Sequence, residues 1–173
     1  MLGRTQTTVG LDIGSSSIKV VELTGKGDDP RLVRFGMAEL APETIVDGEV
    51  MDRQLVIETI QNLFERTQVR NHRVATGVSG RGVIVKKITM DRLPPQEARE
   101  AIHWEAEQHV PYDINDVALD FEILRTDVGP TQMQVLLVAA KRDLISAHAD
   151  LVREAGLVPA VIDVHSFAVQ NAV

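Results

Sequence analysis

The sequence predicts an α/β fold, on three observations. Short runs rich in valine, isoleucine and leucine recur along the chain and are bounded by glycine, serine or proline, as strands are. Between these runs lie segments whose apolar residues recur every three or four positions, which is the spacing of one helix face. With 44% hydrophobic residues among 173, the chain can form one sizeable core or two small subdomains that share a junction.

The first predicted elements are a three-stranded meander and a helix. Apolar runs at residues 9–13, 18–23 and 32–40 predict the strands, and turn residues at 14–17 and 25–30 separate them. The helix is predicted from Asp52, its candidate cap, to Thr67. Its apolar stripe, which we expect to pack on the sheet, consists of Val56, Ile60, Leu63, Phe64 and Thr67.

A strand at residues 74–78 is predicted to return beside the first strand, and a second unit to begin near Gly82. The order in that unit is strand, helix, strand, strand. These four elements are expected at residues 83–90, 96–109, 117–125 and 132–141, with a hairpin turn at 128–130.

The chain then continues with a helix at residues 143–155, closed by Gly156, and a buried strand at 158–164. Residues 165–173 predict the opening of another helix. We expect that helix to continue in a longer protein, and a short terminal helix that docks on the domain is the alternative.

Composition excludes several classes of protein and site. The absence of cysteine excludes disulfides and thiolate metal sites, and the five histidines lack zinc-ligand spacing. The net charge of −7 argues against a nucleic-acid partner. No apolar run reaches the roughly 20 residues that span a bilayer, and residues 1–8 lack the pattern of a secretory signal. We therefore expect a cytoplasmic protein without direct membrane insertion.

The acidic excess is concentrated in one segment. Residues 91–127 hold ten acidic and three basic residues, whereas residues 66–90 hold six basic residues and no carboxylate. Such blocks are usually solvated faces, and a partner or subdomain contact is the alternative.

The motif that indicates chemistry is the segment LDIGSSSIK at residues 11–19. Asp12 stands at a strand end, where it can hold magnesium through the waters of that ion. Gly14 lets the backbone approach a ligand, and the amides of the turn can converge into a nest that binds a phosphate. The candidate site residues are Asp12, Gly14, Ser15, Ser16, Ser17 and Lys19, and the serines add hydroxyl donors.

Strand parity favours a polar role for Lys19, because Lys19 shares a face with Val21 and Leu23. The alternative is an ordinary hairpin whose lysine extends outward to solvent. The segment is not a Walker loop, since it does not end in Gly-Lys-Ser/Thr before a helix. His103, His109 and His165 lack partner groups in the sequence, so we interpret them as surface or packing residues.

Residues 12–19 resemble the first phosphate motif of the actin, Hsp70 and sugar-kinase superfamily, whose fold is ribonuclease H-like. Other stretches are similar to the PilM family of type IV pilus assembly proteins, a branch that itself resembles the division protein FtsA. These stretches are residues 45–50, 77–80, 104–112, 136–141 and 164–173.

The resemblance implies an actin-like subdomain 1A at residues 8–81 and 158–173, with an inserted subdomain 1C at residues 82–157. It implies an ATP-binding scaffold with little or no turnover, in which Asp12 is the magnesium-associated acid and Lys19 contacts a phosphate. The second lobe, with the second phosphate hairpin and the adenosine motif, is expected beyond Val173. We therefore expect no measurable ATP binding by these residues alone, because affinity depends on enclosing the ligand.

The resemblance also implies partners. PilM-like proteins bind the cytoplasmic tail of the inner-membrane protein PilN in a groove between the two subdomains, and they associate with other pilus assembly components. The acidic segment would complement a basic tail, and the candidate apolar anchors are Trp104, Val110 and Tyr112. For Trp104, a place in the core is the favoured alternative. Localisation peripheral to the inner membrane follows, and homo-oligomerisation stays open.

Two other functions stay open at this stage. One is an FtsA-like cell-division protein, and the other is a small-molecule kinase of the same superfamily, which would need a carboxylate base in a substrate cleft. No aspartate is placed for that role by the sequence.

Overall fold

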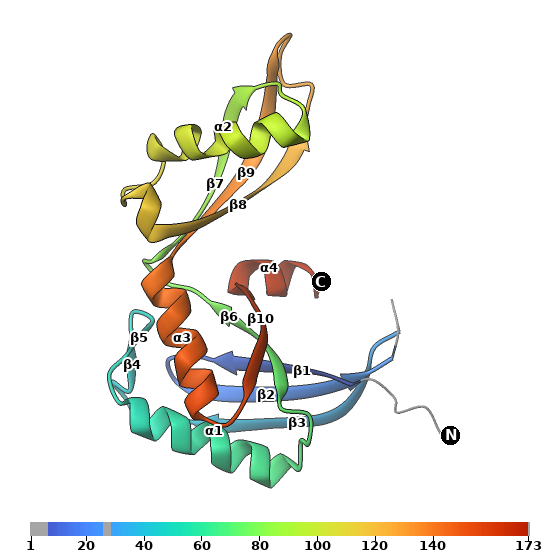
Figure 1. Ribbon diagram of the computed structural model, residues 1–173. Helices are drawn as coiled ribbons and strands as arrows, with labels where there is room; N and C mark the ends of the chain where they lie inside the picture. The colour runs from blue at the N-terminus through green and yellow to red at the C-terminus, as the bar shows by residue number, and fades with distance from the viewer. Residues whose placement is uncertain (1–6, 26–28, 173) are drawn as a thin grey trace. The chain divides into compact units, whose positions relative to one another are not determined.

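The computed structural model describes residues 7–25 and 29–172, which form two compact units (Figure 1). The first unit contains the described residues up to Gly80 and from Ser146 onward, and the second contains Arg81–Ile145. Part of the predicted turn at 25–30 and the last residue of the predicted helix at 165–173 lie outside the described residues.

A five-stranded sheet forms the first unit, in the order β10-β6-β1-β2-β3. In chain order its strands are β1 (Thr7–Ile13), β2 (Ser17–Thr24), β3 (Arg31–Glu39), β6 (Arg73–Val78) and β10 (Val158–Val164). The first three strands are antiparallel neighbours and β6 lies beside β1, as the sequence predicted. The pairing of β6 with β1 is parallel. β10 pairs parallel with β6 and completes the sheet.

Helices α1 (Arg53–Thr67) and α3 (Arg142–Glu154) contribute to the core on one face of this sheet. Alternate strand residues such as Val9 and Val20 point into that core and are fully buried. α1 adds the predicted apolar stripe, and Asp52 caps the helix by accepting a hydrogen bond from the Leu55 N–H at 3.0 Å. A charged pair shares this face, since the buried Glu22 accepts a hydrogen bond from Arg34 at 2.6 Å.

Helix α3 runs from the second unit into the first. The sequence-based boundary assigned residues 82–157 to the second unit, whereas the residues from Ser146 onward belong to the first. The physical reason is packing, because Leu151, Val152 and Ala155 are part of the core beneath the five-stranded sheet. Helix α4 (His165–Gln170) follows β10 and lies on the other side of the sheet from α1 (Figure 1).

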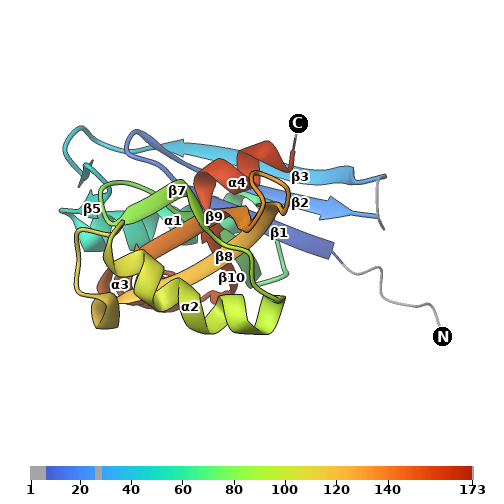
Figure 2. The same cartoon turned by 90° about the horizontal axis from the view of Figure 1, so that it is seen from above.

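The second unit is a three-stranded antiparallel sheet, in the order β7-β9-β8, with helix α2 against one face (Figure 2). Its elements are β7 (Val83–Asp91), α2 (Pro95–Glu107), the short 3-10 helix η1 (Ile114–Asp116), β8 (Val117–Arg125) and β9 (Gln132–Lys141). The core joins Ala98, Ile102 and Ala106 of α2 to apolar residues of the sheet. The predicted order of strand, helix, strand, strand is observed.

A small hairpin that the sequence did not predict joins β4 (Ile45–Val46) to β5 (Glu49–Val50). Its turn residues, Asp47 and Gly48, have φ of 52° and 88°, a conformation that glycine and aspartate tolerate. A Cβ on Gly80 would lie 3.0 Å from the Asp47 carbonyl oxygen, so the two backbones pack closely. The stretches 45–50 and 77–80, both noted in the sequence, therefore meet in space.

None of the helices in residues 7–25 and 29–172 combines the length and apolar character that crossing a membrane requires.

Candidate functional site

The turn between β1 and β2 presents backbone donors to solvent. The Gly14 N–H donates to the Ser17 carbonyl oxygen at 3.0 Å, and the Leu40 N–H donates to the Ser16 carbonyl oxygen at 2.9 Å. Two carbonyls of the turn are thus satisfied within the protein. In the described part of the chain no hydrogen bond uses the N–H of Ser15 or Ser16, and both residues are exposed. These two N–H groups are free to bind an anion.

Fewer backbone N–H groups of this turn are available to a ligand than the sequence predicted. The expectation was that the amides of residues 14–17 converge together. Because the Gly14 N–H closes the turn internally by donating to the Ser17 carbonyl oxygen, it is not available to a ligand. Gly14 has no side chain and so leaves the backbone of the turn accessible.

Asp12 and Lys19 are direct cross-strand neighbours beside the turn. Lys19 Nζ lies 2.7 Å from Asp12 Oδ2, and the side chains of Asp12 and Lys19 are 44% and 40% exposed. Both point away from the core, because their neighbours Leu11 and Ile18 point into it. The ion pair explains why a lysine occupies this face.

His165 adds a third side chain, which the sequence interpretation missed. It is the first residue of α4, and its Nε2 lies 3.5 Å from Asp12 Oδ1. That nitrogen is buried and makes no hydrogen bond with any described residue. The ring lies over Gly77, where any Cβ would overlap it. A glycine inside a strand marks such close approaches, so Gly77 was the signal available in the sequence.

A second histidine lies on the core side of the sheet. His148 Nε2 and Thr76 Oγ1 share a hydrogen bond of 2.9 Å. Burial, and then the nearby charge of His165, lower the pKa of His148 from 6.5 to about 4. His148 is therefore neutral at pH 7 and serves packing rather than acid-base chemistry.

The residues around the turn fit the phosphates of a magnesium nucleotide. The donors of Ser15 and Ser16, the ammonium of Lys19 and the exposed carboxylate of Asp12 lie together at one end of the sheet. The unpartnered His165 nitrogen adds a buried polar atom that no described residue satisfies. No three histidines, aspartates or glutamates of the described residues gather as metal ligands, so magnesium here would take most of its ligands from phosphate and water.

The three candidate partner residues lie in the second unit in different environments. Trp104 is 72% exposed on α2, so the expectation of a core tryptophan is wrong. Val110 is only 6% exposed and belongs to the core, which leaves it no surface for a partner. Tyr112 is half-buried, its hydroxyl donates to the Arg81 carbonyl oxygen at 2.7 Å, and the Lys141 ammonium lies 4.3 Å from its ring.

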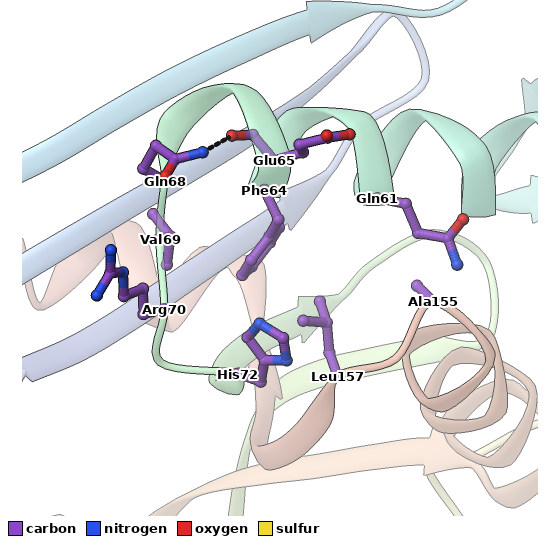
Figure 3. Close-up of a pocket in the computed structure, with 9 residues that line it drawn as sticks. All are labelled: Gln61, Phe64, Glu65, Gln68, Val69, Arg70, His72, Ala155 and Leu157. Atoms are coloured by element: carbon purple, nitrogen blue, oxygen red, sulfur yellow. Dashed lines mark hydrogen bonds between the residues drawn. The ribbon is translucent and has the colours of Figure 1, made fainter.

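A pocket of about 500 Å³ opens elsewhere on the first unit, where α1 ends (Figure 3). Its lining residues are Gln61, Phe64, Glu65, Gln68, Val69, Arg70, His72, Ala155 and Leu157. Asn71, next to this pocket, donates a hydrogen bond to the Thr7 carbonyl oxygen at the start of β1. The pocket therefore lies at the opposite end of β1 from the β1–β2 turn.

Comparison with known proteins gives a family match over most of the chain. Residues 10–173 match the family described as type IV pilus assembly protein PilM. A solved structure described as a PilM-PilN type IV pilus biogenesis complex is 34% identical, with a TM-score of 0.80 over 93% of this chain. The cytoplasmic domain of EpsL, an inner membrane component of the type II secretion system of Vibrio cholerae, is 13% identical with a TM-score of 0.51 over 92% of this chain.

The likeness to EpsL shows a shared fold and no more. The chain spans about half the length of these solved chains, namely 48% of the first and 57% of the second.

Proposed function

Because this chain belongs to the PilM family of type IV pilus assembly proteins, we propose that it binds Mg-ATP at the β1–β2 turn and serves as a scaffold for the cytoplasmic tail of PilN. The first unit corresponds in this proposal to an actin-like subdomain 1A, and the second to the inserted subdomain 1C. ATP binding adjusts the scaffold rather than driving turnover. The scaffold works in the cytoplasm, held at the inner membrane through its partners.

One observation supports nucleotide binding above the others, namely the arrangement of charges and donors at the turn. The Ser15 and Ser16 N–H groups would receive phosphate oxygens, and Lys19 would neutralise part of their charge. Asp12 would hold the hydrated magnesium through its waters, and the ion would neutralise part of the phosphate charge. Lys19 would then exchange its bond to Asp12 for one to phosphate.

Support for the partner comes from the solved complex of PilM with PilN, to which this chain is 34% identical. Of the three candidate contact residues, Trp104 and the accessible part of Tyr112 remain available to such a partner. The acidic segment at residues 91–127, which lies entirely within the second unit, complements a basic tail.

Calorimetry with Mg-ATP tests the nucleotide proposal. The test uses a protein of the relative's full length that contains these 173 residues, because the chain spans 48% of that relative. We expect the full-length protein to bind Mg-ATP and the 173-residue chain to show no measurable binding. Replacing Ser15 and Ser16 with proline removes both turn N–H groups, and unchanged affinity in that variant would reject the turn as the phosphate site.

Binding of a PilN tail peptide, measured by fluorescence anisotropy, tests the scaffold proposal separately. Binding with and without ATP should differ if the nucleotide adjusts the scaffold. A tail that does not bind under either condition would contradict the partner assignment.

A further inference from the structure

The outward face of α2 carries an exposed tryptophan that the fold does not require there. Trp104 has the highest exposed fraction, 72%, of any large apolar side chain among the described residues. It lies about 200° around the helix from the buried Ile102, at 3.6 residues per turn. An indole exposed to water lacks the stabilisation that burial of its apolar surface would give. A partner that covers the indole would supply that stabilisation.

Carboxylates surround this tryptophan on the same side of the helix. Glu97, Glu100 and Glu107 are exposed and lie within about 60° of Trp104 around the helix axis. In residues 7–25 and 29–172, none of the three forms an ion pair or a side-chain hydrogen bond. We call this set, Glu97, Glu100, Trp104 and Glu107, the Trp104 flank.

The basic side chain of α2 is directed elsewhere. The Arg99 guanidinium lies 5.7 Å from the ring centroid of Phe121 on β8. It therefore does not neutralise the Trp104 flank, which carries three negative charges around one large apolar surface.

We propose that the Trp104 flank is a docking surface for a basic protein segment that carries an apolar anchor residue. Lysine or arginine side chains of that segment pair with the three glutamates, and its apolar anchor residue covers the indole. The charge of the flank selects this occupant over an acidic or uncharged one. The inference rests on the proposed scaffold role and adds the surface and the chemistry through which a partner is held.

Trp104 is itself the reporter for the test, because it is the sole tryptophan of the sequence. A lysine- and leucine-rich peptide is titrated into the chain while the tryptophan emission and its acrylamide quenching are followed. We expect a blue shift and protection from quenching with this peptide, and neither with a glutamate- and leucine-rich peptide of equal length. Added salt should weaken the binding, since the charges are exposed.

The decisive variant is Glu97→Gln, Glu100→Gln and Glu107→Gln together, which keeps Trp104. We expect it to weaken basic-peptide binding by at least about tenfold. Its matched control is Glu39→Gln, Glu49→Gln and Glu122→Gln, which makes the same charge change at other exposed positions and should bind like the parent chain. Equal affinities of the two triple variants would overturn the proposal, because binding would then reflect net charge alone.

Two further outcomes separate this inference from the scaffold proposal. If the PilN tail binds but Trp104→Ala and the flank triple variant leave that binding unchanged, the partner proposal stands and the docking surface is rejected. If the basic peptide binds at the Trp104 flank and the PilN tail does not bind, the surface stands and PilN is not its occupant. Sedimentation that shows a dimer abolished by Trp104→Ala would identify a second copy as the occupant and overturn the proposal.

Discussion

Two ion pairs on the same sheet of the first unit differ in burial and in what they can do. Glu22 and Arg34 lie 2.6 Å apart on the core face, where the glutamate side chain is 6% exposed. Asp12 and Lys19 lie 2.7 Å apart beside the β1–β2 turn, and each side chain is at least 40% exposed. Lys19 and Glu22 belong to the same strand, and its pleat sends them to opposite faces.

The difference in burial indicates that the fold depends on the Glu22–Arg34 pair more than on the Asp12–Lys19 pair. A carboxylate taken out of water must keep its partner, because an unpaired buried charge is strongly destabilising. An exposed pair contributes about 0–1 kcal/mol, so its presence at the turn is not explained by stability. The exposed pair is therefore the one that can exchange partners with a ligand.

Replacing Arg34 with alanine should have the largest effect. Glu22 would be left on the core face without its hydrogen-bonded partner, and we expect a loss of about 3 kcal/mol in the free energy of unfolding. Urea denaturation of the 173-residue chain measures it.

The control for that prediction removes both charges at once. Glu22→Leu combined with Arg34→Met should stay within about 1 kcal/mol of the parent chain, since no charge is left unpaired. A double variant as unstable as Arg34→Ala would mean that the loss reflects packing of the arginine stem rather than the charge of Glu22.

His148 extends the comparison to a second polar group on the core face. Its pKa is lowered from 6.5 to about 4, so between these values the unfolded chain binds a proton that the folded chain excludes. The contribution of His148 to the free energy of unfolding should therefore change little above pH 6.5 and fall by about 3 kcal/mol as the pH drops from 6.5 to 4. The groups that face His148 are Thr76, which shares its hydrogen bond, and His165, whose charge opposes protonation.

The measurement compares urea unfolding of the parent chain and His148→Gln across this pH range. Glutamine can keep the bond to Thr76 but does not titrate, so the difference between the two curves isolates the histidine. Parallel curves for the two proteins would contradict the assignment of a buried neutral His148.

A third prediction concerns how His165 is held beside the exposed pair. Gly77→Ala places a Cβ where the imidazole lies, and we expect a loss of about 1–2 kcal/mol together with displacement of His165 from Asp12. In Gly77→Ala with His165→Ala the ring is gone, so the methyl group fits. The double variant should therefore be destabilised by less than the sum of the single variants, and strict additivity would show that the two residues do not compete for space.

The strands and helices could be predicted because their signals are local. The alternation in β1 and β2 and the apolar stripe of α1 follow directly from contacts with one core. The β4–β5 hairpin was missed because each strand has two residues, too few for a periodic pattern. Trp104 could not be placed from periodicity, since hydrophobicity alone does not show whether an indole faces a core or a partner.

The candidate site likewise contains residues that the sequence predicted and one residue that it did not. Asp12, the turn and Lys19 are contiguous, so a nine-residue motif in the sequence contained them. His165 reaches Asp12 only because β10 pairs with β6 and brings the start of α4 over Gly77, and such long-range placement requires the sheet order. The closure of the turn by the Gly14 N–H is likewise a matter of backbone geometry that residue types do not specify.

The smallest effect on stability is expected at the exposed Asp12–Lys19 pair. This prediction tests whether that pair differs in role from the buried Glu22–Arg34 pair. Lys19→Gln removes one charge from a half-exposed pair, so the free energy of unfolding of this chain should change by less than about 1 kcal/mol. In a protein of the relative's full length, the same change should weaken Mg-ATP binding by about tenfold or more, since a charge-assisted phosphate contact is lost. Urea denaturation and calorimetry measure the two quantities. If Lys19→Gln destabilised the chain as much as Arg34→Ala does, the Asp12–Lys19 pair would be a structural one, and the reason for assigning the turn to phosphate would lose its main support.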